Sequence, residues 1–416
     1  MCDRDERGIE GDTQHTAVSS QPMENHRSHR WDWSTVPVHE AVGMVLAHDI
    51  TEIRPGEYKG RAFKKGHVIK EEDICHLQRL GKERLYVLHI GKEELHEDDA
   101  ALRLATALMG EGVEMQGEPK EGKINIIASR DGLLKIDAER LKAFNMLGEV
   151  MCATLHSNTL VRKGQVVAGT RAIPLVVKKA VVEEAVKRLK AEGERLKTNG
   201  VIEVKELRRP RAGVVITGNE VYYGRIKDAF APVIERKIRA FDGEIVGIYY
   251  APDDAGYIET RLRELMDAGA DLLITTGGMS VDPDDVTRFA IRALGVREMH
   301  YGSAVLPGAM FLVAYVEKSG VRSQKSGVRG QRGSPKNQRF FGAEESEALN
   351  TQHSTLIPVL GIPACGMYHK TTIFDLVLPR ILAGEQIGRE ELAEMGHGGL
   401  CLNCKECRYP LCPFGK

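Results

Sequence analysis

The chain has 416 residues, of which 42% are hydrophobic and 28% charged, and its formal net charge is -1. These values are typical of a globular protein of about two to four domains, and so small a net charge argues against nucleic acid or an anionic membrane as a partner. No apolar run approaches the roughly 20 residues that a bilayer span needs, and the N-terminus lacks the apolar core of a secretory signal. We therefore expect a cytoplasmic protein.

The N-terminal half is predicted to contain a tail and two small modules. Residues 1–30 are polar and show no periodicity, so we expect a disordered tail. Residues 31–96 combine strand-like runs with a short helical pattern, which indicates an α+β module. Residues 97–206 hold a helix and a β-rich stretch, followed by a charged helix from Val181 to about Lys197 that we expect to act as a spacer.

Residues 207–388 are predicted to form an α/β domain. Three apolar strand patterns alternate with three helical patterns between Val214 and Leu294. This alternation implies a parallel sheet with helices on both faces, which is a three-layer arrangement. In such sheets, ligands bind beyond the carboxyl ends of the strands.

Two further strand-like runs complete this domain. Phe311 to Val316 is expected to be a strand, Leu356 to Leu360 its continuation, and Thr371 to Ile381 a closing helix. Residues 318–352 lie between the two runs, contain few apolar residues and repeat the sequence Ser-Gly-Val-Arg. Such a composition indicates a flexible, basic insertion.

The stretch from Asp271 to Thr287 carries the strongest local signal for a site. An apolar run is followed by Gly277 and Gly278, which can adopt positive φ angles and turn their N–H groups toward an anion. Asp282 then has the features of a helix N-cap. A strand, a glycine loop and a helix N-terminus together can bind a phosphate or a polar ring, although a plain β-to-α turn has the same pattern.

Four of the eight cysteines are close together near the C-terminus, with the spacing C-x2-C-x2-C-x4-C, namely Cys401, Cys404, Cys407 and Cys412. In a reducing compartment this spacing favours a metal site over disulfides. Four thiolates suit Zn²⁺, and the run also resembles the ferredoxin pattern that ends in Cys-Pro. Zinc and an iron–sulfur cluster both fit. We expect residues 393–416 to be a metal-binding tail that folds independently of the core.

The α/β domain resembles the molybdopterin-binding domain shared by enzymes of molybdenum cofactor biosynthesis. The resemblance covers residues 207–317 and 353–384 and rests on four motifs. The first is Thr275–Ser280, with Asp285–Thr287 at the spacing found in the molybdopterin adenylyltransferases. The others are Ile216–Val221 with Gly224 and Asp228, then Pro307-Gly308, and finally Ile362-Pro363. The long region before the core is closer in layout to the molybdopterin molybdenumtransferases, which insert molybdate into adenylylated molybdopterin.

This resemblance implies roles for individual residues. The residues expected to bind molybdopterin are Gly218, Thr276, Gly277, Gly278, Ser280, Pro307 and Gly308. Those expected to be catalytic are Asp285, Glu220 and Asp228, and those expected to hold Mg²⁺ as AMP leaves are Asp253 and Asp285. The implied partners are adenylylated molybdopterin, molybdate, a molybdenum enzyme or adenylyltransferase, and further copies of the chain in a homo-oligomer.

The chain departs from the transferase pattern near the expected reaction site. Ile362–Gly366 stands where the transferases have Leu-Pro-Gly-Asn-Pro, Leu306 and Ala309 stand in place of two lysines, and Asn219 replaces an aspartate. These changes leave open a non-catalytic molybdopterin carrier or sensor. A second alternative is a nucleotide pyrophosphatase of the competence-induced protein type, which shares the same core and the Gly-x-Glu loop.

Overall fold

The computed structural model describes residues 34–54, 58–88, 90–190, 200–279, 286–317 and 356–415. The chain divides into two compact units between Ile90 and Gly91. The predicted tail 1–30 and the predicted insertion 318–352 lie outside the described residues, as do Ser280, Asp282 and Asp285. Within the described ranges, no helix has the length and apolar character needed to cross a membrane.

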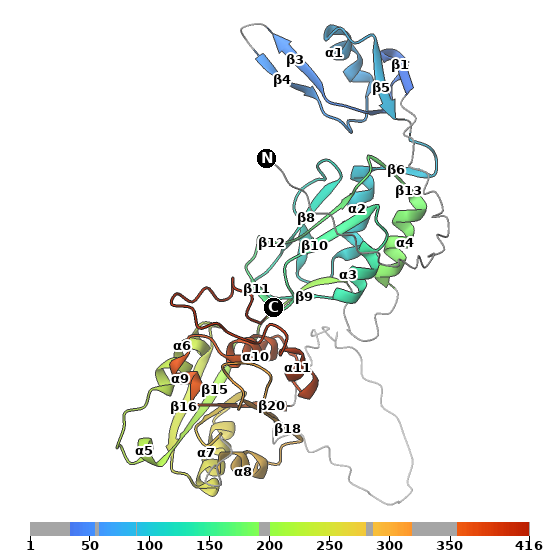
Figure 1. Cartoon of the computed structure of the whole chain (residues 1–416). Coiled ribbons are helices and arrows are strands. Elements are labelled where there is room, and N and C mark those ends of the chain that lie inside the picture. The colour runs from blue at the N-terminus through green and yellow to red at the C-terminus, as the bar shows by residue number, and fades with distance from the viewer. Residues whose placement is uncertain are drawn as a thin grey trace, which may run out of the picture. The chain divides into compact units, whose positions relative to one another are not determined.

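The first unit has a small sheet and a hairpin around a core of its own (Figure 1). Its sheet has the strand order β1 (Ser34–Pro37), β5 (Arg84–Leu88), β2 (Val45–Leu46), and its hairpin consists of β3 (Ile50–Arg54) and β4 (Tyr58–Phe63). Its helical segments are η1 (Val38–Glu40), η2 (Glu71–Asp73) and α1 (Ile74–Arg79). Leu46, Leu77 and Val87 are fully buried in the core of this unit.

The second unit begins with a β-rich part whose strands all pair in antiparallel fashion. The largest of its three sheets has the strand order β10 (Val150–Thr154), β12 (Val166–Ala172), β8 (Lys123–Ala128), β7 (Val113–Met115). The second has the order β11 (Thr159–Val161), β9 (Gly132–Ile136), β14 (Ile202–Lys205). The third consists of β13 (Val176–Lys178) and β6 (Glu94–His96). The helices are α2 (Glu97–Leu108), α3 (Ala138–Asn145) and α4 (Lys179–Lys190).

Two expectations for this region are corrected. The strand Glu94–His96, which we assigned to the N-terminal module, pairs with β13 in the second unit. The charged helix α4 is not a spacer, because Val182, Ala185 and Leu189 on one of its faces are buried in the same core as α2. A high content of charge describes only the exposed face of such an amphipathic helix.

The rest of the second unit is built on a six-stranded sheet with the order β16-β15-β17-β20-β19-β18. These strands are β15 (Arg211–Thr217), β16 (Glu244–Ala251), β17 (Leu272–Thr276), β18 (Glu298–Tyr301), β19 (Leu312–Glu317) and β20 (Leu356–Ile362). The helices are α5 (Asn219–Tyr222), α6 (Phe230–Arg239), α7 (Ala255–Asp267), α8 (Thr287–Ala293), α9 (Cys365–Tyr368), α10 (Ile373–Leu382) and α11 (Arg389–Glu394). β16, β15, β17 and β20 are parallel.

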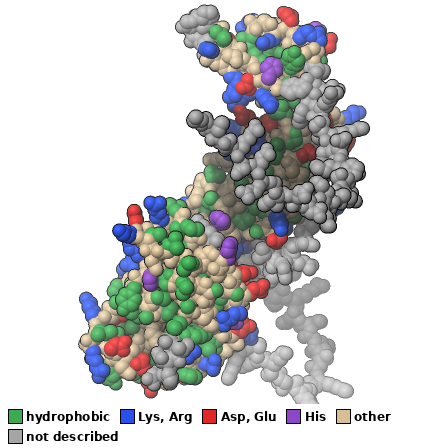
Figure 2. All heavy atoms as spheres, viewed as in Figure 1, with side chains coloured by type: hydrophobic (Ala, Val, Ile, Leu, Met, Phe, Trp, Pro, Cys, Tyr) green, Lys and Arg blue, Asp and Glu red, His purple; other side chains and the backbone are tan. Residues whose placement is uncertain are grey.

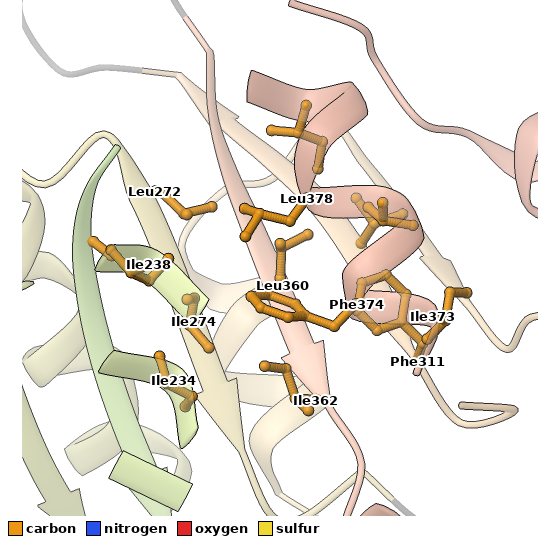
Figure 3. Close-up of a cluster of buried hydrophobic side chains, with 14 of the residues drawn as sticks. Ile234, Ile238, Leu272, Ile274, Phe311, Leu360, Ile362, Ile373, Phe374 and Leu378 are labelled. Atoms are coloured by element: carbon orange, nitrogen blue, oxygen red, sulfur yellow. The ribbon is translucent and has the colours of Figure 1, made fainter. Parts of the chain in front are cut away.

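Helices cover both faces of this sheet, so the predicted three-layer α/β class is confirmed. On one face, Ile274 of β17 packs with Ile234 of α6 and Phe374 of α10 (Figure 3). On the other face, Leu273 of β17 packs with side chains of α7 and α8, including Leu262. Alternate residues of one buried strand therefore serve two different cores.

The segment Leu356–Leu360 does not continue the strand that ends near Val316. Leu312 of β19 pairs with Gly361 of β20, and Glu317 pairs with Leu356, so the two strands are antiparallel neighbours. An apolar run indicates that a strand is buried, but it does not indicate the direction of the strand in the sheet.

Candidate site at the carboxyl edge of the sheet

The strand register brings the predicted site segments to one edge of the sheet. Ile216 of β15 pairs with Thr276 of β17, and Thr276 pairs with Ile362 of β20. On the other side of β15, Thr217 pairs with Ala251 of β16. Because these strands are parallel, the segments that follow them leave the sheet at the same edge, which is where ligands bind in α/β folds.

The two glycines after β17 adopt the conformation that the sequence predicted. Their φ angles are 79° at Gly277 and 53° at Gly278. Both positions are also crowded by the chain itself. A β-carbon on Gly277 would lie 2.4 Å from the carbonyl oxygen of Thr217, and one on Gly278 would lie 2.4 Å from Oγ1 of Thr287. Backbone geometry and packing therefore both require glycine here.

A group of buried threonines surrounds this loop. The Oγ1 of Thr217 donates a hydrogen bond to the carbonyl oxygen of Thr276 at 2.8 Å and lies 3.2 Å from Oγ1 of Thr287. These contacts join the ends of β15 and β17 to the start of α8. Oγ1 of Thr275 and Oγ1 of Thr276 are buried and have no hydrogen-bond partner among the described residues. A buried hydroxyl without a partner is costly, and Thr276 is the last residue of β17, directly before the glycine loop.

The predicted carboxylates are engaged in local structure. Asp228 accepts hydrogen bonds from the backbone N–H groups of Phe230 and Ala231, at 2.8 and 2.9 Å, and so caps the start of α6. Asp253 accepts from the N–H of Asn219 at 3.2 Å. The helix α7 is capped by the next residue, Asp254, which accepts a hydrogen bond from the N–H of Tyr257 at 2.7 Å.

Of the two residues predicted to hold Mg²⁺, only Asp253 lies in the described ranges, so their pairing stays a prediction. Within the described ranges, no three His, Cys, Asp or Glu side chains make a group that could hold a metal ion. Glu220 lies exposed on α5, and Gly218 directly before it donates its backbone N–H to the carbonyl of Ala251 at 3.1 Å. The other predicted Mg²⁺ ligand, Asp285, lies outside the described residues.

The Pro307-Gly308 turn lies at the same edge, just before β19. The carbonyl oxygen of Pro307 accepts a hydrogen bond from the backbone N–H of Ile373 at 3.2 Å, at the start of α10. A β-carbon on Gly308 would lie 2.4 Å from a side-chain carbon of Ile373. The turn is therefore packed against α10, and its glycine is needed for this close approach.

An aromatic group on the β16 side of this edge was not predicted from the sequence. The guanidinium carbon of Arg261 lies 5.0 Å from the ring centre of Tyr249 and 4.8 Å from that of Tyr257, which are cation–π distances. Tyr222 at the end of α5 contacts Tyr257, and the neighbouring Tyr223 is 63% exposed. Tyrosines spread over three sequence segments give no local signal of such a cluster.

The C-terminal tail is not independent of the core, which corrects our expectation. Leu306, beside the Pro307-Gly308 turn, donates its N–H to the carbonyl of Gly399 and accepts from the N–H of Cys401, both at 2.8 Å. Leu392 of α11 and Phe414 are buried in the core on the α6 and α10 face, with 1% and 4% of their surface exposed.

All four tail cysteines line one cavity of about 540 Å³. The cavity is also lined by Tyr368, the last residue of α9, and by His369–Thr371, which lie between α9 and α10. Oγ1 of Thr371 lies 3.3 Å from Sγ of Cys407, and this hydrogen bond lowers the pKa of the Cys407 thiol. Figure 2 shows hydrophobic side chains gathered on one face of the second unit. Leu400 and Leu402, beside the cysteines, are exposed.

Residues 213–381 match the family model described as a probable molybdopterin binding domain. The match begins in β15, ends in α10 and includes the glycine loop and the threonine group. The second unit therefore contains a domain of this family, which confirms the predicted resemblance at the level of the domain. The match does not distinguish transferases from other members of the family. Residues 35–89 match a domain of unknown function (DUF8806).

Individual relatives cover only part of the chain. A CinA-like protein of Mycobacterium avium (strain 104) is 38% identical over 89 residues, which are 21% of this chain and 20% of that protein. A CinA-like protein of Mycolicibacterium gilvum (strain PYR-GCK) is 37% identical over 89 residues, 21% of each. The chain thus spans about a fifth of the length of these curated relatives. The solved structure of the tungsten cofactor synthesizing protein MoaB from Pyrococcus furiosus is 17% identical, with a TM-score of 0.28, and covers 43% of this chain and 98% of that one.

Proposed function

We propose that this chain binds molybdopterin at the carboxyl edge of its six-stranded sheet and acts in late molybdenum cofactor synthesis, where it inserts molybdate into adenylylated molybdopterin with release of AMP. The observation that carries the proposal is the glycine loop after β17 with the unpartnered hydroxyl of Thr276 beside it. The loop lies within the segment that matches the probable molybdopterin binding domain.

The residues at this edge suit an anionic ligand with a polar ring. Backbone N–H groups in positive-φ turns, here at Gly277 and Gly278, form concave sites for anions such as the molybdopterin phosphate. The exposed ring of Tyr223 offers a flat surface for stacking, and Arg225, whose guanidinium carbon lies 5.5 Å from that ring, adds a positive charge.

Release of AMP separates insertion from binding alone. Purified protein is mixed with adenylylated molybdopterin and molybdate, and AMP is measured by chromatography against a reaction without molybdate. Molybdate-dependent release of AMP supports the transferase. Asp285→Asn should abolish this release if the carboxylate acts in the reaction, and unchanged activity would remove Asp285 from the proposal.

A non-catalytic carrier or sensor is the second candidate, and the described carboxylates favour it. The carboxylate of Asp228 caps α6, and that of Asp253 accepts a hydrogen bond from the N–H of Asn219. Both carboxylates therefore have a structural role that requires no catalysis. This candidate predicts tight binding of molybdopterin without release of AMP. The likeness to the CinA-like proteins keeps a nucleotide pyrophosphatase as a third candidate, which predicts hydrolysis of ADP-ribose and no affinity for the pterin.

The Thr276→Val variant tests the site itself. The hydroxyl of Thr276 has no partner among the described residues, and valine has nearly the same shape. We therefore expect the free energy of unfolding to change by less than about 1 kcal/mol, while affinity for molybdopterin falls by about tenfold as one hydrogen bond is lost. Binding is measured by isothermal titration and stability by urea unfolding.

Thr275→Val is the matched control on the same strand. Thr275 is also buried and unpartnered, but it comes one residue earlier and so faces the opposite side of the sheet. We expect its affinity to stay closer to that of the wild type. Equal affinities in the wild type and Thr276→Val would place the ligand elsewhere.

A further inference from the structure

We propose that the cavity lined by the four tail cysteines is the binding site of an iron–sulfur cluster of the [4Fe–4S] type, held by the thiolates of Cys401, Cys404, Cys407 and Cys412. This inference does not depend on the proposed function, because a cluster can be assembled and measured in protein that carries no pterin.

The arrangement of the thiols favours a cluster over a single zinc ion. Tetrahedral Zn²⁺ binds sulfur at about 2.3 Å, which brings the four sulfurs within roughly 4 Å of one another and leaves no space between them. All four cysteines line one cavity of about 540 Å³. A cluster places iron and sulfide between its thiolates, so its ligands are spread around a larger volume.

The core of the domain holds the cavity in shape. The backbone N–H of Cys401 donates a hydrogen bond to the carbonyl oxygen of Leu306 at 2.8 Å. Oδ1 of Asn403 lies 2.9 Å from Nδ1 of His369. Phe414, two residues beyond Cys412, is buried in the core. Metal-dependent modules such as zinc fingers are unfolded without their metal. Here the anchors outside the cysteines keep the thiols near one another in the metal-free chain.

The walls of the cavity suit the charge of a cluster. Four thiolates around a [4Fe–4S] core carry a net negative charge, and the cavity is lined by two cations, Lys370 and Arg408, and by one anion, Glu406. The hydroxyl of Thr371 lies 3.3 Å from Sγ of Cys407, and hydrogen bonds to cluster sulfurs are common in such sites.

Anaerobic reconstitution of the full chain tests the proposal. Metal-free protein is treated with ferrous iron and sulfide, desalted, and analysed for iron, acid-labile sulfide and visible absorption. We expect about four irons and four sulfides per chain and an absorption that bleaches on reduction. A parallel sample receives Zn²⁺ alone, and we expect chelator to remove this zinc. Colourless protein that keeps one zinc against chelator, or protein that keeps neither metal, would overturn the proposal.

Serine variants identify the ligands. Cys404→Ser and Cys407→Ser should each lose most of the bound iron while the unfolding midpoint of the metal-free protein stays unchanged. Cys365→Ser is the matched control, because Cys365 lies on α9 only three residues before Tyr368 and does not line the cavity. Cys75→Ser, in the first unit, is a second control. Equal iron content in Cys404→Ser and the wild type, or equal loss in Cys365→Ser, would refute the assignment.

Discussion

At the scale of single residues, the close approach of Gly278 and Thr287 determines which substitution can test ligand binding without also disturbing the packing. Oγ1 of Thr287 lies 2.4 Å from the place that a β-carbon on Gly278 would take, and Thr287 is fully buried. Gly278→Val therefore disturbs packing and ligand binding together. The Thr276→Val variant leaves the packing intact, which makes it the better test of the site.

The pair Asp137–Arg140 makes stability depend on pH. Burial by itself would raise the pKa of the Asp137 carboxyl. Hydrogen bonds from the backbone N–H and the guanidinium of Arg140 have the larger effect, so the pKa of Asp137 lies below the ordinary value of an aspartate. Arg140 also donates to the carbonyl oxygens of Leu189 and Gly200, both at 3.0 Å. Because the folded-state pKa is the lower one, the stabilisation is present above the unfolded pKa and is lost as pH falls through the folded value.

We expect Asp137→Asn to lower the free energy of unfolding by about 1–3 kcal/mol at neutral pH, with the difference from wild type shrinking below about pH 4. Urea unfolding across this pH range measures it. Asp131→Asn is the control, because Asp131 forms an exposed pair with Arg162 and should matter little. If the difference in unfolding free energy between Asp137→Asn and wild type did not change with pH, the charge of Asp137 would not contribute to stability.

At the scale of elements, the C-terminal segment stabilises the domain that it covers. Leu306 and Leu400 form a β-bridge, and Ile387, Leu392 and Phe414 are buried in the core on the α6 and α10 face. Fully burying a large apolar side chain contributes about 1.5–3 kcal/mol. Truncation after Gln386 should therefore destabilise the domain by several kcal/mol, in contrast to a freely attached tail.

Two point variants measure this contribution without deletion. Phe414→Ala should lower the free energy of unfolding by about 3–5 kcal/mol, because it leaves a cavity in the core. Leu411→Ala, three residues earlier, should change it by less than about 0.5 kcal/mol, because Leu411 is 89% exposed. Urea unfolding of metal-free protein compares the two. Equal, small effects would show that the tail packs only weakly on the core.

At the scale of the whole molecule, each of the two units has a core of its own. The first buries Leu46, Leu77 and Val87, and the second has separate cores in its β-rich part and on both faces of the six-stranded sheet. We expect a fragment that starts at Gly91 to unfold cooperatively and to bind molybdopterin with the affinity of the full chain. The matched fragment 34–90 should fold alone with low stability, since so short a chain buries little surface.

Calorimetry and titration on the two fragments test this independence. A fragment 91–416 that fails to unfold cooperatively, or that binds molybdopterin more weakly than the full chain, would show that the first unit supports the second. Unchanged binding would assign the pterin site to the second unit alone.

Local patterns in the sequence were sufficient for the α/β class and for the glycine loop. A buried strand such as Leu272–Thr276 is visible as an apolar run, and the two glycines after it indicate positive φ because only glycine adopts it without strain. The domain family followed from short motifs of this kind, and the family match confirmed it.

Only the tertiary structure decided the contacts between distant residues. The hydroxyls of Thr217 and Thr287, 70 residues apart in the sequence, lie within hydrogen-bond distance. Leu306 forms a β-bridge with Leu400, and β20 runs antiparallel to β19. It also showed that Asp228 and Asp253 serve local structure and that the tail is anchored through Phe414. The physical reason is that a sequence pattern reports burial and local backbone geometry, whereas the partner of each strand, hydroxyl or carboxylate depends on how the whole chain packs.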